Sequence, residues 1–271
     1  MKKVYEDIKR ANRIVVKVGT STLTYDTGKM NLKRINQLAM ILSDLRNQGR
    51  EIILVSSGAI GIAVGKLGLL EKPQETKRKQ AIAAVGQCEL MYLYDKLFSD
   101  YNNTVAQILL TKEDIEIPRR KRNTQNTIET LLEMGIIPIV NENDTVSADE
   151  IEIGDNDILS AAVADLIDAD LLVLFSDIEG LYDADPHVNS DAQLVPVVYD
   201  ITKVRGVAGG AGTKRGTGGM VTKLNAAELA AGAGIHMVIA NGNDIGRLYD
   251  ILAGKPVGTL FVSKNFVKGQ D

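Results

Sequence analysis

The sequence has 271 residues, of which 45% are hydrophobic and 24% are charged, the composition of an ordinary globular protein. Lys and Arg number 31 and Asp and Glu number 35, so the formal charge of −4 gives the whole chain no attraction for nucleic acid or an anionic membrane. No apolar run reaches the roughly 18 residues of a membrane span. The length suits one large α/β domain or two small ones.

The N-terminal sequence, the single cysteine and the lack of a membrane span predict a cytoplasmic protein. Lys2 and Lys3 precede the first predicted strand without an apolar signal core. Cys88 is the only cysteine, so no intrachain disulfide is possible. Cys88 lies in a helical pattern, and we expect its side chain to be packed.

Strand and helix patterns alternate along the chain. Apolar runs predict buried strands at 13–18, 51–55, 104–110, 136–140, 170–175, 235–240 and 258–262. Helical spacing predicts helices at 32–48, 76–97, 123–134, 158–167, 224–233 and 245–252. The basic segment 112–122 is interpreted as a solvated surface loop. This alternation predicts an α/β fold with a mainly parallel sheet covered on both faces.

A lysine lies inside the first predicted strand. Lys17 is followed closely by Gly19, Thr20 and Ser21. A buried ammonium group is costly without a counter-charge, although a lysine at a strand end also reaches the surface by extending its side chain. Small residues allow an anion to approach closely, so they favour an anion site here.

Polar residues cluster after the strand predicted at 136–140. The segment 139–157 contains Asn141, Glu142, Asn143 and Asp144, and then residues 154–157 read Gly-Asp-Asn-Asp. These residue types are common in turns. They also lie at the carboxyl end of a buried strand, where open α/β sheets bind ligands. Two such clusters favour a binding site.

Two glycine-containing turns lead into helices. Residues 56–61 read Ser-Ser-Gly-Ala-Ile-Gly, and residues 206–219 hold seven glycines before a helix that carries Lys223. Backbone N–H groups at such a helix start bind phosphate, and the lysine adds positive charge. A merely flexible glycine-rich loop is the alternative for 206–219.

The familiar phosphate motifs are absent from the sequence. It has no P-loop, no dinucleotide fingerprint and no protein-kinase signature. Lys17, Lys223 and the carboxylates of Asp144 and Asp157 remain. Phosphoryl transfer requires mainly positioning and charge neutralisation. An acceptor carboxylate is already ionised at neutral pH, so it needs no general base.

Six motifs together resemble the glutamate 5-kinases of the amino acid kinase family. In chain order they are Lys17-Val-Gly-Thr-Ser21, Val55-Ser-Ser-Gly-Ala-Ile60, Asn141-Glu-Asn-Asp144, Gly154-Asp-Asn-Asp157, Ser176-Asp-x-x-Gly-Leu-Tyr182 with Asp185-Pro186, and Thr217-Gly-Gly-Met-x-Thr-Lys223. The resemblance implies a three-layer αβα sandwich and transfer of phosphate from ATP to the γ-carboxylate of L-glutamate, the first step of proline biosynthesis. Ser176 stands where a threonine is common in the family.

The resemblance also implies roles for individual residues. Lys17 and Lys223 would neutralise the migrating phosphoryl group, and Asp157 would orient both lysines. Ser57, Asp144 and Asn156 would bind glutamate. The nucleotide would be lined by Lys17, Ser176, Asp177, Thr217, Gly218, Gly219, Met220, Val221, Thr222 and Lys223. Mg²⁺ would arrive with ATP, since no dedicated protein metal site is evident.

The resemblance further implies one amino acid kinase domain over 1–271, with the acceptor site in its N-terminal half and the ATP site in its C-terminal half. The PUA domain of many relatives is not expected. We expect a homo-oligomer, either a dimer or a tetramer, with L-proline as a feedback inhibitor and neither nucleic acid nor membrane as a partner.

Two alternatives remain open at this point. One is another amino acid kinase, acting on aspartate, acetylglutamate, carbamate or a nucleoside monophosphate. The other is a non-catalytic sensor of nucleotides or amino acids. Two lysines and an aspartate in these motifs favour an enzyme, because binding alone does not require them.

Overall fold

The computed structural model describes residues 2–25, 27–146, 156–186, 188–189, 191–206 and 219–268. The chain divides into two compact units. The middle unit is Val18–Asn156, and the terminal unit joins Met1–Lys17 to Asp157–Asp271. The single domain expected over 1–271 stays a prediction.

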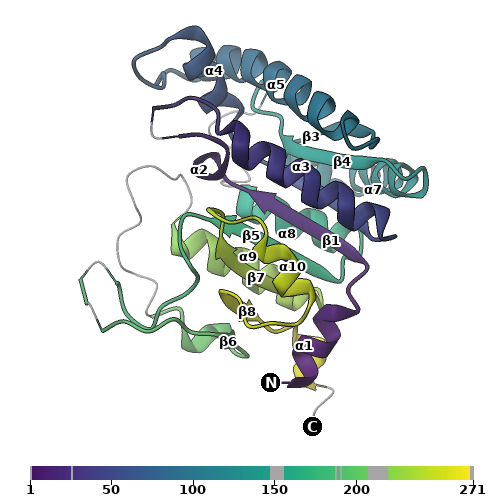
Figure 1. Cartoon of the computed structure of the whole chain (residues 1–271), viewed down its shortest axis with the longest axis vertical. Coiled ribbons are helices and arrows are strands. Elements are labelled where there is room, and N and C mark those ends of the chain that lie inside the picture. The colour runs from purple at the N-terminus through teal and green to yellow at the C-terminus, as the bar shows by residue number, and fades with distance from the viewer. Residues whose placement is uncertain are drawn as a thin grey trace. The chain divides into compact units, whose positions relative to one another are not determined.

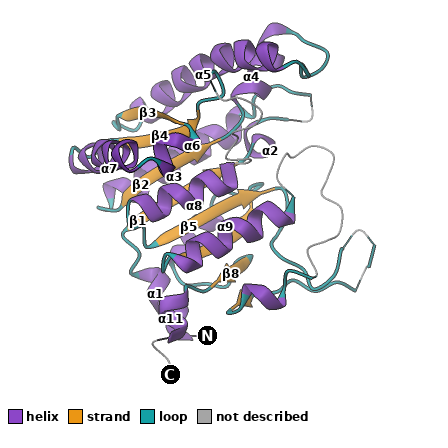
Figure 2. Cartoon of the chain, turned by 180° about the vertical axis from the view of Figure 1, so that it is seen from behind, coloured by secondary structure: helices purple, strands orange, loops and turns teal. Residues whose placement is uncertain are grey.

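The middle unit contains a parallel sheet with the strand order β3-β4-β2. These strands are β2 (Glu51–Ser56), β3 (Val105–Leu110) and β4 (Ile137–Glu142). The helices are α2 (Thr20–Leu23), α3 (Leu32–Asn47), α4 (Ala59–Leu67), α5 (Thr76–Ser99), α6 (Lys112–Glu116) and α7 (Pro118–Glu133). Helix α3 lies in front of the strands in Figure 1, and α7 lies in front when they are seen from behind in Figure 2.

The terminal unit contains the strand order β1-β5-β7-β8-β6. Its strands are β1 (Arg13–Val18, within this unit through Lys17), β5 (Leu171–Ser176), β6 (Val197–Val198), β7 (His236–Asn241) and β8 (Thr259–Phe261). Its helices are α1 (Lys2–Lys9), α8 (Asn156–Leu166, within this unit from Asp157), η1 (Ile201–Lys203), α9 (Met220–Gly232), α10 (Arg247–Leu252) and α11 (Lys264–Lys268). Strand β5 pairs with β7 in parallel, and β7 pairs with β8 antiparallel.

The predicted fold class is confirmed, since helices cover both faces of a mainly parallel sheet. In the terminal unit, α10 lies in front of the strands in Figure 1, and α8 and α9 lie in front in Figure 2. All six residues of β5 are buried, which explains its unbroken apolar sequence. No helix of the described part of the chain is long and apolar enough to cross a membrane.

Two sequence-based interpretations are wrong. The segment 112–122 is helical, not a loop: the capping box of Thr111 and Asp114 starts α6, and Pro118 occupies the first turn of α7. Cys88 is exposed on α5 rather than packed. Gly86, Gln87 and Leu90 form the buried face of that helix.

Helices α4 and α5 approach each other closely at Gly86. A Cβ atom at this position would lie 1.7 Å from the carbonyl oxygen of Ala59 and 3.1 Å from the Cβ of Ala63. Only a glycine fits where a helix backbone is this near. The contact holds α5 against α4, the helix that follows the turn at Ser57 and Gly58.

Replacing Gly86 by Ala should force α4 and α5 apart. We expect a loss of about 3 kcal/mol in the free energy of unfolding, because the added methyl group overlaps a backbone carbonyl. Urea denaturation followed by circular dichroism measures this loss. The matched control is Gly232→Ala in α9, where an added Cβ meets nothing within 4 Å. The control should be neutral or slightly stabilising, and an equal effect of the two substitutions would contradict the packing argument.

Candidate active site

Three charged side chains meet inside the terminal unit. The Nζ atom of Lys17 lies 2.5 Å from Oδ1 of Asp157, and the Nζ atom of Lys223 lies 3.0 Å from Oδ2 of the same carboxylate. Relative exposures are 6% for Lys17, 0% for Asp157 and 5% for Lys223. The structure therefore brings the three predicted catalytic residues together. With two ammonium groups and one carboxylate, the cluster carries net positive charge.

The environment of Asp157 keeps its carboxyl group ionised. Burial alone raises the pKa of Asp157, but the ammonium groups of Lys17 and Lys223 outweigh burial and hold that pKa below its ordinary value of 3.8. A carboxylate that stays ionised at neutral pH and is fully engaged with two lysines is a poor general base. Its geometry fits an orienting role.

The local structure explains how these groups reach one another. Lys17 is near the carboxyl end of β1, Asp157 is in the first turn of α8, and Lys223 is in the first turn of α9. An acidic residue near a helix start interacts favourably with the helix dipole. Helix α9 begins after Gly219 without a side-chain cap, so its first N–H groups are suited to an anion.

A second polar cluster lies in the middle unit. The Nδ2 atom of Asn156 donates to Oγ of Ser57 at 2.7 Å and to Oδ1 of Asn141 at 2.9 Å. The Nδ2 atom of Asn141 in turn donates to Oε1 of Gln87 at 2.8 Å. Two predicted acceptor-site residues, Ser57 and Asn156, are thus in direct contact. The third, Asp144, is half-buried in the turn that follows β4.

Buried hydroxyl groups lie beside this cluster. The Oγ atom of Ser56 and the Oη atom of Tyr94 are 2.8 Å apart. Burial raises the pKa of Tyr94 far above its ordinary value of 10.0. The hydroxyl of Tyr94 therefore stays protonated at neutral pH. Ser56, the residue before Ser57, is held by a hydrogen bond between two neutral groups.

Part of the predicted nucleotide site lies at the carboxyl end of β5. The Oγ atom of Ser176 donates to Oδ1 of Asp177 at 3.0 Å, and Ser176 pairs in register with Asn241 of β7. Gly219, Met220 and Thr222 are half-buried at the start of α9, whereas Val221 is exposed. Four predicted or motif residues fall outside the described residues: Gly154, Asp155, Thr217 and Gly218.

Sequence reasoning gave no role to Gln87 or Asn141. The second belonged to the polar cluster after β4, but the first is a single amide within a long helix. Its spacing from Ala83 and Leu90 places it on the buried face of α5. A lone glutamine on an apolar helix face was the available signal.

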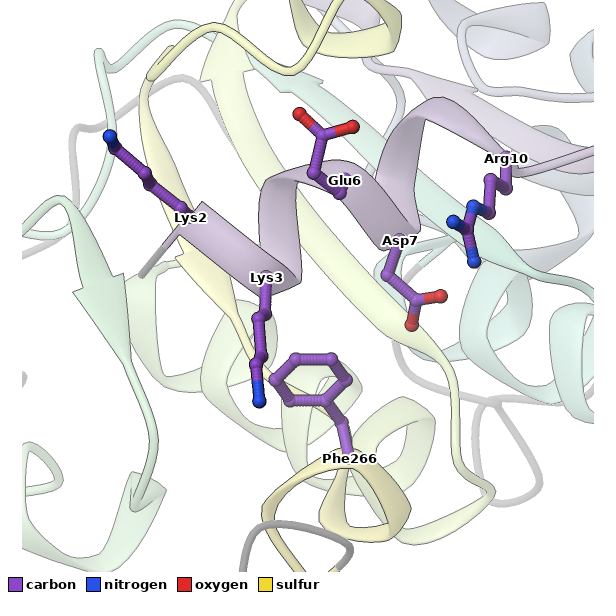
Figure 3. Close-up of a pocket in the computed structure, with 6 residues that line it drawn as sticks. All are labelled: Lys2, Lys3, Glu6, Asp7, Arg10 and Phe266. Atoms are coloured by element: carbon purple, nitrogen blue, oxygen red, sulfur yellow. The ribbon is translucent and has the colours of Figure 1, made fainter.

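A surface hollow in the terminal unit lies elsewhere. It is lined by Lys2, Lys3, Glu6, Asp7, Arg10 and Phe266, from α1 and α11 (Figure 3). None of these residues belongs to the predicted site. The candidate active site rests on the ion cluster and the amide cluster instead.

The chain is similar to known proteins over nearly its whole length. The family model described as "Amino acid kinase family" matches residues 12–241. The chain belongs to the amino acid kinase family. A glutamate 5-kinase of Clostridium perfringens is 55% identical over 95% of this chain and 97% of its own length. A glutamate 5-kinase of Clostridium tetani is 55% identical over 94% of this chain and 96% of its own length.

A solved structure also matches the fold of this amino acid kinase family member. The UMP kinase of Bacillus anthracis aligns with a TM-score of 0.64 over 94% of this chain and 97% of that one. The sequences are only 18% identical, so this likeness concerns the fold alone. It confirms the predicted amino acid kinase fold.

Replacing Asp157 by Asn should leave two buried ammonium groups without their carboxylate. We expect the free energy of unfolding to fall by about 3–5 kcal/mol. Because the folded pKa of Asp157 lies below the unfolded value, its contribution is full above the unfolded pKa and is lost as pH falls through the folded pKa. Urea denaturation over a pH series should show a constant difference from the wild type near neutral pH that shrinks in acid.

The control for this series is Asp191→Asn, which changes an exposed carboxylate of the same unit. It should leave the unfolding free energy within about 0.5 kcal/mol of the wild type. A difference for Asp157→Asn that grows rather than shrinks in acid would contradict the ionised state assigned to Asp157.

Proposed function

We propose that this protein transfers the γ-phosphoryl group of ATP to the γ-carboxylate of L-glutamate. The products are L-glutamyl 5-phosphate and ADP, and the reaction is the first step of proline biosynthesis. The observation that carries the proposal is the buried cluster of Lys17, Asp157 and Lys223 in a chain 55% identical to glutamate 5-kinases over nearly its whole length.

The lysine cluster is suited to the phosphoryl group. Charge develops on the transferring oxygens, and two ammonium groups in a water-poor site neutralise it without reorganisation. In the proposed mechanism Lys17 and Lys223 contact these oxygens. Asp157 holds both ammonium groups in place and accepts no proton. The glutamate carboxylate attacks phosphorus directly, since it is ionised at neutral pH.

The nucleotide is proposed to lie at the start of α9 and the end of β5. Backbone N–H groups after Gly219 would bind phosphate oxygens. The remaining lining residues are proposed to be Ser176, Asp177, Thr217, Gly218, Met220, Val221 and Thr222. Each of those that the structure describes lies at the end of a strand or in the first turn of a helix.

Mg²⁺ is proposed to enter with ATP rather than to reside in the protein. Among the described residues no group of three or more His, Cys, Asp or Glu side chains is arranged to hold a metal ion. Mg²⁺ prefers phosphate oxygens and water to an all-protein cage. No step assigned to this chain's own residues depends on a metal ligand from the protein.

The amide cluster is proposed to hold L-glutamate. The hydroxyl of Ser57 and the amide of Asn156 supply neutral hydrogen bonds, and the carboxylate of Asp144 pairs with the substrate ammonium group. An amino acid carries both charges, so a site for it needs donors and acceptors together. This set contains both kinds.

Assembly, regulation and location remain part of the same proposal. We propose a homo-oligomer, a dimer or tetramer, that acts in the cytoplasm, where ATP is available. L-Proline is proposed as a feedback inhibitor of the pathway's first step. One amino acid kinase domain is proposed to contain both sites.

ADP release should depend on L-glutamate. We expect turnover with L-glutamate and background rates with L-aspartate, N-acetyl-L-glutamate, carbamate and UMP, each tested at equal concentration. A coupled assay measures ADP, and hydroxylamine traps the acyl phosphate as a hydroxamate. Turnover with aspartate and none with glutamate would overturn the substrate assignment. ATP binding without turnover on any acceptor would favour a sensor.

Replacing Lys223 by Met should remove one of the two ammonium groups while keeping most of the side-chain volume. We expect kcat to fall by about 10²–10³, the loss typical for one group that stabilises developing charge. The matched control is Lys203→Met in η1, an exposed lysine of the same unit. Unchanged kcat in Lys223→Met, with the fold checked by circular dichroism, would show that the assigned role is wrong.

A further inference from the structure

A chain of side-chain amides links helix α5 to the proposed acceptor site. It runs from Gln87 through Asn141 to Asn156 and ends on the hydroxyl of Ser57. Gln87, Asn141 and Asn156 are exposed by 7%, 2% and 9%. Such buried amides are oriented by their hydrogen bonds, because each presents a donor on one side and an acceptor on the other.

One backbone group fixes the orientation of the hydrogen-bonded amides. The N–H of Glu142 donates to Oδ1 of Asn141 at 2.9 Å. A backbone N–H is always a donor, so the atom of Asn141 that faces it must be the oxygen. The nitrogen of Asn141 therefore faces Gln87, and Gln87 must present its oxygen in return.

The same argument fixes the orientation of the Asn156 amide, which contacts Ser57. The oxygen of Asn141 also faces Asn156, so Asn156 must present its nitrogen there, and this nitrogen donates to Ser57 as well. The amide oxygen of Asn156 is thereby left as an acceptor on the opposite side of its amide. Because Ser57 accepts from Asn156, its own O–H is left as a donor. This polarity suits an amino acid, with an acceptor for ammonium and a donor for carboxylate.

This orientation of the amides leaves one polar group of Gln87 unpaired within the described part of the chain. Its Nε2 atom is buried and has no hydrogen-bond partner among the described residues. An unpaired buried donor is unfavourable. An apolar side chain of equal length would avoid the penalty but would give Asn141 nothing to donate to. The glutamine therefore contributes its oxygen to the chain rather than stability from its nitrogen.

We propose that Gln87 is a positioning residue for the acceptor substrate. It acts through Asn141, fixing the orientation of Asn156 and the availability of the Ser57 hydroxyl, and it touches no reacting atom. The inference rests on the proposed function in one respect, that Ser57 and Asn156 hold the acceptor. It adds a residue on α5 to the determinants of acceptor binding.

Two substitutions separate the oxygen of Gln87 from its volume. Gln87→Met keeps the length but removes the acceptor, and we expect KM for L-glutamate to rise about tenfold while KM for ATP stays within twofold. Gln87→Glu keeps an accepting oxygen whether or not it is protonated, and KM for glutamate should stay within about threefold of the wild type. The matched control is Gln125→Met on α7, a half-buried glutamine whose Nε2 donates to Glu129.

A double substitution tests the orientation assigned to the amides of Gln87 and Asn141. In Asn141→Asp the atom facing position 87 becomes an acceptor, so the glutamine must turn its nitrogen toward it. Gln87 should then tolerate the change, whereas Gln87→Glu combined with Asn141→Asp places two carboxyl groups in contact, which repel each other when both are ionised. We expect the double variant to raise KM for glutamate at least tenfold more than the product of the single effects.

The outcomes divide clearly. A selective rise of the acceptor KM in Gln87→Met, rescued in Gln87→Glu, supports the proposal. Equal changes in both KM values, or a lower denaturation midpoint with unchanged KM, would overturn it. If the wild type used another acceptor, the proposed function would fail, and the same KM split for that acceptor would still decide the role of Gln87.

Discussion

The structure depends on one buried carboxylate held between two lysines. Burying Lys17 or Lys223 alone would cost several kcal/mol, because an ammonium group loses its hydration. Asp157 offsets that cost for both side chains at once, at 2.5 and 3.0 Å. The start of α8 and the start of α9 must therefore reach the carboxyl end of β1. Positive charge is concentrated there in a form suited to a phosphoryl group.

The second constraint is the orientation of hydrogen-bonding side chains rather than their charge. In the middle unit, the hydrogen-bonded side-chain amides between Gln87 and Ser57 have fixed orientations. The backbone N–H of Glu142 determines these orientations. If this cluster holds the acceptor as proposed, the charges of an amino acid would be matched by Asp144 and by dipoles of fixed polarity. The close approach of α5 to α4 at Gly86 places Gln87, the next residue, on the buried face of α5.

The two clusters are joined at one point of the sequence. Asn156 ends the middle unit and Asp157 resumes the terminal unit, yet they are consecutive residues in the first turn of α8. One helix start thus supplies an amide to the amide cluster and a carboxylate to the two lysines. This arrangement explains why a short Gly-Asp-Asn-Asp motif carries so much of the functional signal.

The sequence by itself determined the alternation of strands and helices, the family, and the residues of the ion cluster. Buried strands read as apolar runs, and a lysine or aspartate within or beside such runs is conspicuous because its burial is costly. Other features of the structure could not be predicted from the sequence. The helical structure of residues 112–122 depends on a cap and a proline that the basic run obscured, and the exposure of Cys88 depends on which face of α5 meets α4. Only the tertiary structure pointed to Gln87, because the orientation of its amide is set by Asn141, 54 residues away, and leaves no pattern in the chain.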